Sequence, residues 1–110
     1  MPTKFRVRIT LAAERDIEDI WTFIARDNAD AASGFIQRLE AQIETLARFP
    51  ERCPLAPESK LLNAEIREIF HGRRQHKHRM LFNVSGDEVH VLHVRHGARL
   101  ALGEPVTSEE

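Results

Sequence analysis

The segment His71–Arg79, which reads HGRRQHKHR, carries the densest concentration of positive charge in the chain. Its nine residues include three arginines, one lysine and three histidines, and no acidic residue. Guanidinium groups bind phosphate and carboxylate through paired hydrogen bonds, so this composition is suited to a nucleic acid, a nucleic-acid enzyme or an acidic partner. The alternative is a solvated hairpin rim, because charged residues also protect exposed strand edges from aggregation.

Basic residues continue on both sides of this segment. Residues 67–99 hold seven lysines and arginines against three acids, whereas residues 11–51 hold nine acids against four arginines. A net charge of −1 therefore conceals an acidic first half and a basic second half, a division that can steer a polyanion to one face. The candidate binding residues are Arg67, Arg73, Arg74, Lys77, Arg79, Arg95, His96 and Arg99.

Histidine and cysteine indicate no metal site or cofactor. The six histidines show no structural zinc spacing and are accompanied by a single cysteine, so we expect neither a bound metal nor a cofactor. Cys53 cannot form an intrachain disulfide and lies in a proline-rich loop, which favours a reducing compartment over a catalytic role. We therefore expect a cytoplasmic protein with no membrane segment.

The first elements that must position these residues are a strand and a helix. Lys4–Thr10 alternates between apolar and polar residues, which is typical of a half-buried strand. Leu11–Asp27 has apolar residues at helical spacing and predicts an amphipathic helix with Thr10 as its N-cap. The stripe expected to face the core comprises Ile17, Ile20, Trp21 and Ile24.

A second helix is expected over Ala31–Arg48, with Asp30 as its N-cap and Pro50 beyond its end. Its core stripe comprises Phe35, Leu39, Ile43 and Leu46. Because only a short turn separates the two helices, we expect an antiparallel helical hairpin. Pro50–Lys60 contains three prolines and is expected to be a loop.

Three strands are expected after this loop. Leu61–Phe70 is compatible with a helix or a strand, and we favour a strand near Glu65–Phe70 because the next strand needs a pairing partner. Arg79–Val84 and Glu88–His96 are strands joined by a tight turn, and apolar residues on both faces place the latter centrally in the sheet. HGRRQHKHR would then be the turn and entry of a hairpin.

The resulting fold class is α+β. An N-terminal strand and a helical hairpin pack on an antiparallel sheet in the order β-α-α-β-β-β. We expect one domain over residues 1–103 and a flexible tail over residues 104–110.

The order of these elements resembles the RelE/ParE superfamily of type II toxin–antitoxin toxins, and most closely its ParE branch. The resemblance runs from Phe5 to Arg99 and is strongest in AERDIEDIWTFIARDNADAA and in the ending LHVRHGAR. It implies a toxin neutralised by a cognate antitoxin. ParE-like members poison DNA gyrase, whereas RelE-like members cleave messenger RNA in the ribosome, so a ribosome-dependent or free endoribonuclease is the alternative.

The residue types at the positions of the RelE-like catalytic pattern favour DNA gyrase over messenger RNA as the target. RelE-like nucleases use basic residues on the central strands and commonly a tyrosine near the C-terminus, and this chain contains no tyrosine. Another basic position of that pattern falls on Ile69, and the terminal tyrosine position falls near Pro105. If the protein is a ribonuclease, the resemblance makes Arg67, Arg79, His96 and Arg99 the catalytic candidates.

Overall fold

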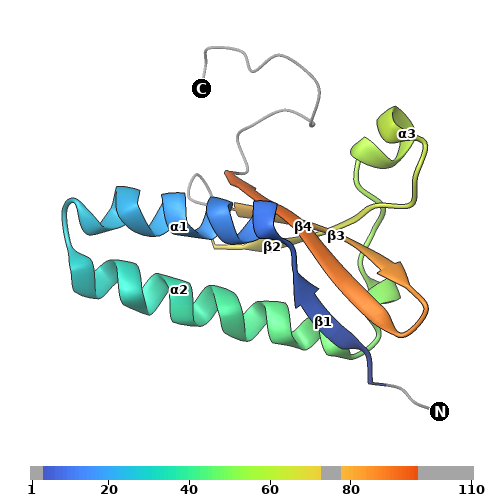
Figure 1. Ribbon diagram of the computed structural model, residues 1–110, viewed down its shortest axis with the longest axis horizontal. Coiled ribbons are helices and arrows are strands. Elements are labelled where there is room, and N and C mark those ends of the chain that lie inside the picture. Colours follow the sequence, from blue (N-terminus) through green and yellow to red (C-terminus); the bar gives the residue numbers. More distant parts are fainter. Residues whose placement is uncertain (1–3, 73–77, 97–110) are drawn as a thin grey trace.

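The computed structural model describes residues 4–72 and 78–96. Its elements follow the predicted order of strand, two helices and three strands, and the α+β class is confirmed (Figure 1). The strands and longer helices are β1 (Arg6–Ile9), α1 (Leu11–Ala25), α2 (Ala29–Glu44), β2 (Arg67–His71), β3 (His78–Ser85) and β4 (Glu88–His96). Two 3-10 turns at Thr45–Ala47 and Pro50–Arg52 and a five-residue helix, α3 (Glu58–Leu62), lie in the connection from α2 to β2.

The four strands form one sheet in the order β1-β4-β3-β2. β2, β3 and β4 pair antiparallel as predicted, whereas β1 pairs with β4 in parallel, so the sheet is mixed. β4 lies between β1 and β3, which confirms its central position. β2 pairs with β3 from Arg67 opposite Phe82 to His71 opposite His78, which confirms both the strand interpretation of this region and the hairpin entry.

The main core lies between the sheet and the antiparallel pair α1 and α2, which run side by side in Figure 1. Leu39, Ile43 and Leu46 are buried in it and Phe35 packs against it, as predicted. The sheet contributes its alternate side chains to this core, which comprise Met80, Phe82, Val89, Val91 and Val94.

An extra residue in β4 redirects its side chains. Leu81 is opposite His93 and Phe82 is opposite Val91, so Leu92 is a β-bulge. Leu92 therefore joins a second, smaller cluster with Ala56, Ile66 and Leu81 on the other face of the sheet.

Two details of the helices differ from the prediction. Trp21 is 40% exposed and is not a core residue, because Ile17, Ile20 and Ala13 set the direction of the inward face and Trp21 lies beside it. Asn28, not Asp30, caps α2, since its Oδ1 accepts a hydrogen bond from the Ala31 amide at 3.0 Å. The Thr10 cap is confirmed, since Thr10 Oγ1 accepts from the Ala13 amide at 3.2 Å.

No helix in the described part of the chain is long and apolar enough to cross a membrane. The expected tail, residues 104–110, lies outside the described residues.

Candidate binding face of the sheet

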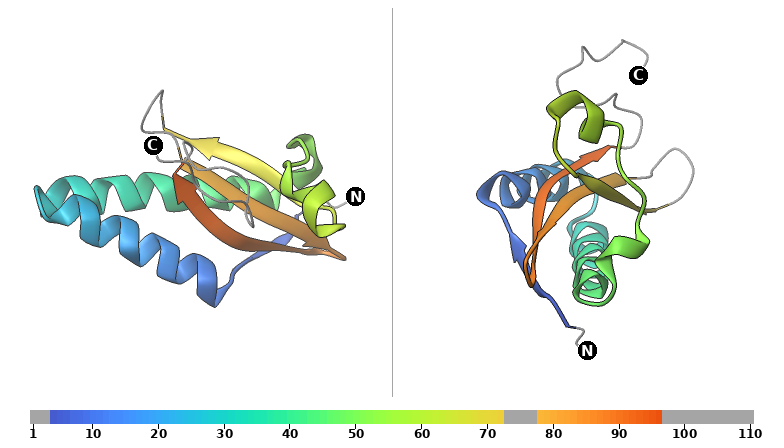
Figure 2. Two further views of the ribbon diagram at one scale, coloured as in Figure 1. Left: turned by 90° about the horizontal axis from the view of Figure 1, so that it is seen from above. Right: turned by 90° about the vertical axis from the view of Figure 1, so that its right-hand side faces the viewer.

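The face of the sheet opposite the main core carries the candidate site. Strand alternation places Arg79 on this face with Leu81, because Met80 and Phe82 point into the main core. α3 lies over this face and apart from the α1–α2 hairpin (Figure 2), so the connection between α2 and β2 covers part of it.

Arg79 is the centre of a buried ion cluster. Its Nη2 donates to Glu58 Oε2 at 2.6 Å, and its Nη1 donates to Glu58 Oε1 at 3.1 Å and to Glu68 Oε1 at 2.9 Å. The side chains of Arg79, Glu58 and Glu68 are only 6%, 0% and 14% exposed. The hydrogen bond that Arg79 donates to Glu58 raises the pKa of Arg79 above its ordinary value, against the effect of burial, and the hydrogen bond to Glu68 raises it further.

This cluster changes how Arg79 should be interpreted as a site residue. Sequence reasoning placed it on an exposed rim, among the residues that meet a target or an antitoxin. The structure places it in the interior, with two carboxylates on its guanidinium. An external phosphate or carboxylate reaches Arg79 only if α3 moves away from the sheet.

The guanidinium of Arg67 also contacts groups of its own chain. Its Nη1 donates to the Cys53 carbonyl at 2.6 Å, and its Nη2 lies 3.9 Å from Glu65 Oε2. These contacts tie the proline-rich loop to β2. Cys53 beside it is buried, and burial raises the pKa of its thiol, whereas Arg52 and Arg67 lower it. A raised pKa favours the protonated, unreactive thiol at neutral pH.

Arg95 differs from Arg79 and Arg67 in its contacts within the described residues. It lies opposite Arg79 in the register of β3 and β4, and its side chain is half-buried. Its Nε has no hydrogen-bond partner and its guanidinium forms no ion pair among the described residues. Glu58 and Glu68, the acids of the buried ion cluster, are engaged with Arg79.

The other predicted site residues are less well placed. His96 ends β4 opposite His78, and its side chain is not described. Arg73, Arg74, Lys77 and Arg99 lie outside the described residues. At the base of the hairpin, His71 Nδ1 lies 2.6 Å from Gln42 Oε1, while Gln42 Nε2 donates to the Phe70 carbonyl at 2.7 Å.

These two contacts define which ring nitrogen of His71 carries a proton. Because Gln42 donates through Nε2, its Oε1 must be the acceptor, so His71 carries a proton on Nδ1. Burial, and then the charge of Arg38, lower the pKa of His71 below its ordinary value. His71 is therefore neutral at physiological pH.

An apolar groove of about 390 Å³ lies on the same face, between the start of α1 and the end of α3. Its lining comprises Thr10, Ala12, Leu62, Ile66, Leu81, Leu92 and His93. Leu61 and Leu62 of α3 are about half exposed beside it. His93 is fixed in this position by Asp16, whose Oδ2 lies 3.0 Å from His93 Nδ1 and accepts from the Val94 amide at 3.0 Å.

Sequence reasoning missed Glu58, Glu68 and this groove. Glu58 lies in a segment expected to be a loop, and no periodicity marks a helix as short as α3. The signal that was present is chemical, since a strand with Glu68 next to a strand with Arg79 allows a cross-strand ion pair. The position of Glu58 depends on the tertiary fold alone.

The described basic positions of the nuclease pattern make contacts within the chain. Arg79 is paired with acids, Arg67 is bonded to a backbone carbonyl, and Ile69 packs against the main core. Among the side chains that the structure describes, no three of His, Cys, Asp and Glu are grouped so that they could hold a metal ion. The remaining features of this face are the cation Arg95 and the apolar groove beside α3, and both are suited to binding a partner protein.

Comparison with known proteins agrees with this architecture. The family model for the ParE toxin of the type II toxin–antitoxin system parDE matches residues 7–101. The solved structure "Chromosomal ParDE TA system from P. aeruginosa" contains a chain with a similar fold, at a TM-score of 0.67 and 17% identity, with 84% of this chain and 96% of that chain covered. No curated protein matches significantly. The protein belongs to the ParE toxin family of type II toxin–antitoxin systems.

Proposed function

We propose that this toxin arrests bacterial growth by poisoning DNA gyrase, and that a cognate antitoxin neutralises it in the cytoplasm. The observation that carries the choice of gyrase over RNA is the state of Arg79. A metal-independent ribonuclease needs an accessible cation to stabilise the phosphorane. Here the cation at the matching position is buried and neutralised by Glu58 and Glu68.

Two further features support the same choice. The chain contains no tyrosine, which removes the usual C-terminal proton donor of RelE-like nucleases. Ile69 contributes to the main core and supplies no charge on β2. The protein is then an interaction protein, and its basic residues act by contact.

Pulse labelling after induced expression tests this proposal. DNA and protein synthesis are followed side by side in a bacterium that carries the inducible gene. We expect DNA synthesis to fall first while translation continues. If protein synthesis collapses first, within minutes, the messenger RNA endoribonuclease is the better account, and Arg67, His96 and Arg99 become catalytic candidates.

The antitoxin is proposed to contact the basic end of the sheet. Arg95 and the adjacent apolar groove support this proposal, because an acidic segment with apolar side chains complements both. Arg73, Arg74, Lys77 and Arg99 are proposed to belong to the same surface from their positions in the sequence.

Charge reversal at Arg95 tests the antitoxin surface. We expect Arg95→Glu to weaken the purified toxin–antitoxin complex by about tenfold or more, since it removes one attraction and adds a repulsion. The matched control is Arg26→Glu, at the exposed C-terminal end of α1, which should leave the affinity unchanged. Equal affinity of Arg95→Glu and the parent protein would remove Arg95 from the interface, and reversal of both Arg73 and Arg74 tests the hairpin in the same assay.

A further inference from the structure

His71 and His78 lie directly opposite each other in the antiparallel pair of β2 and β3. Directly opposed residues project from the same side of a sheet, with their Cβ atoms about 5 Å apart. Both imidazoles also contact Phe35 of α2, with ring centroids 5.3 Å away for His71 and 5.2 Å away for His78. The two rings are therefore neighbours on the side of the sheet that faces the helices.

The imidazole of His71 is held in place by a chain of hydrogen bonds. Gln42 Nε2 donates to the Phe70 carbonyl at 2.7 Å, and Gln42 Oε1 accepts from His71 Nδ1 at 2.6 Å. The other ring nitrogen of His71, Nε2, then carries the lone pair. Histidines that bind metal ions usually donate their second ring N–H to an oxygen in this way, which fixes both the tautomer and the orientation of the ring.

The charge state of His71 also suits a metal ligand. Burial and the charge of Arg38 lower the pKa of His71, so its imidazole is neutral at physiological pH, and the neutral imidazole is the form that binds metal ions. The charge of Arg38 also repels a divalent cation, and two histidines are fewer protein ligands than the four of a structural zinc site. An ion bound here is therefore expected to exchange with the solvent.

We propose that His71 and His78 bind a divalent transition-metal ion between β2 and β3, with water in the remaining coordination positions. Imidazole nitrogen is a preferred ligand of Zn²⁺, Ni²⁺ and Cu²⁺, whereas Mg²⁺ and Ca²⁺ prefer oxygen. His78 can keep a hydrogen bond at one ring nitrogen and bind the ion through the other. The ion joins the strands on either side of residues 73–77, and its binding is independent of the target on which the toxin acts.

The spacing of the histidines in the sequence does not reveal this pair. His71 and His78 belong to no short metal-binding motif, and only strand pairing brings them together. The register of the sheet continues the row in β4, where the backbone of His96 lies opposite His78.

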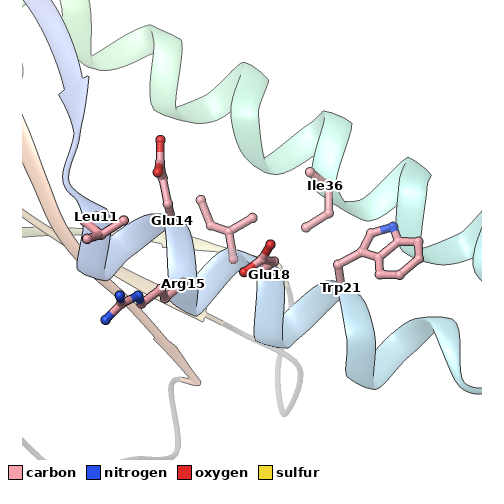
Figure 3. A pocket seen from close by; sticks show the side chains of 7 residues that line it. Leu11, Glu14, Arg15, Glu18, Trp21 and Ile36 are labelled. Carbon is pink, nitrogen blue, oxygen red and sulfur yellow. The ribbon is translucent and has the colours of Figure 1, made fainter.

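Urea unfolding in the presence of Zn²⁺ tests the site, because an ion that binds the folded protein preferentially stabilises it. Trp21 is the only tryptophan in the chain, and Figure 3 shows it facing Ile36 across the gap between α1 and α2. Its emission therefore reports on unfolding of the helical hairpin. At neutral pH we expect Zn²⁺ to raise the urea midpoint of the parent protein in a saturable way, and Mg²⁺ at the same concentration to leave it unchanged.

Single variants locate the bound ion. His71→Phe and His78→Phe each keep a ring beside Phe35 and remove one ligand, so each should weaken Zn²⁺ binding by about tenfold or more. Gln42→Leu removes only the oxygen that orients His71, and it should also weaken binding by about tenfold. The matched control is His90→Phe in β4, which should leave the affinity for Zn²⁺ unchanged.

Side-chain ¹⁵N NMR tests the same site in the parent protein, without a substitution that affects folding. Addition of Zn²⁺ should shift the Nε2 resonance of His71, while Nδ1 of the same ring stays protonated. One ring nitrogen of His78 should shift with the same dependence on Zn²⁺ concentration. The ring nitrogens of His90 and His93 should not shift.

The combined result decides whether this metal site exists. Stabilisation of the parent protein and of His90→Phe by Zn²⁺, lost in His71→Phe and His78→Phe and accompanied by the NMR shifts, supports the proposal. It is overturned if Zn²⁺ does not stabilise the parent protein, if Mg²⁺ stabilises it equally, if either ring variant keeps full affinity, or if the ring nitrogens of His71 and His78 do not shift.

Discussion

His71 shows how neighbouring residues change the behaviour of a single ionisable group. Its imidazole packs edge-on against Phe35, bonds to Gln42 and lies near the positive charge of Arg38. Burial and this charge lower its pKa in the folded state, whereas the unfolded chain has the ordinary value near 6.5. Below that pH the unfolded chain takes up the proton more readily than the folded protein.

The expected result is therefore a loss of stability as the pH falls from about 7.5 to 5.5. Part of this loss should disappear in His71→Phe, which keeps a ring beside Phe35 and cannot be protonated. The measurement is urea unfolding of both proteins at several pH values. An identical pH dependence in the variant would show that His71 does not contribute to it.

At the residue scale, the sequence supplies the type of each side chain and little about its partners. Arg79 and Arg95 look equivalent in the sequence, since both are arginines at strand positions on the same face. The fold gives Arg79 two carboxylates and leaves Arg95 without one among the described residues. The difference arises from Glu58, which is 21 residues away in the sequence, and no local pattern predicts that contact.

At the scale of elements, α3 depends on the ion cluster beneath it. A five-residue helix is too short to be stable alone. It is held by Glu58 against Arg79, and by Ser59, whose Oγ accepts from the Ile66 amide at 2.7 Å and donates to the Ile66 carbonyl at 2.6 Å. These contacts place Leu62 at the edge of the apolar groove.

Removal of one member of the cluster should be costly. We expect Arg79→Ala to lower the free energy of unfolding by about 3–5 kcal/mol, because the buried charge of Glu58 then loses its hydrogen-bonded guanidinium. The double variant Arg79→Met, Glu58→Leu should recover much of this loss, since it removes the guanidinium and the fully buried carboxylate and retains apolar volume, while the remaining acid, Glu68, is partly exposed. Urea unfolding measures both, and Arg8→Ala, which breaks the exposed pair with Glu88, should cost no more than about 1 kcal/mol.

A double variant as unstable as Arg79→Ala would contradict this account of the cluster. The loss would then come from altered packing of β3, and the charges of Arg79 and Glu58 would not be its cause.

Periodicity predicted the long elements well, and it did so for a physical reason. Alternation in β1 and the helical stripe of α2 reflect which side chains are removed from water, so the pattern and the burial agree. The parallel pairing of β1 with β4 is not encoded locally, because it joins residues about 80 positions apart. Asn28 and Asp30 have equal capping chemistry, and backbone geometry alone decides between them.

At the scale of the whole molecule, the chain has an acidic helical hairpin, and the excess of basic residues lies in the second half of its sequence. The charge counts of the sequence predicted this division, and the fold turns it into two separate surfaces. One carries Arg95 and the groove beside α3, and the other carries Trp21 between α1 and α2. A toxin that must meet a target and an antitoxin has a use for more than one surface.

The most direct measurement is the supercoiling activity of purified DNA gyrase in the presence of the purified toxin, with purified messenger RNA incubated in parallel. We predict that the toxin inhibits supercoiling in proportion to its concentration, that the cognate antitoxin reverses this inhibition, and that the RNA stays intact with or without ribosomes. Full gyrase activity together with toxin-dependent cleavage of the RNA would contradict the account and would assign the basic residues to catalysis.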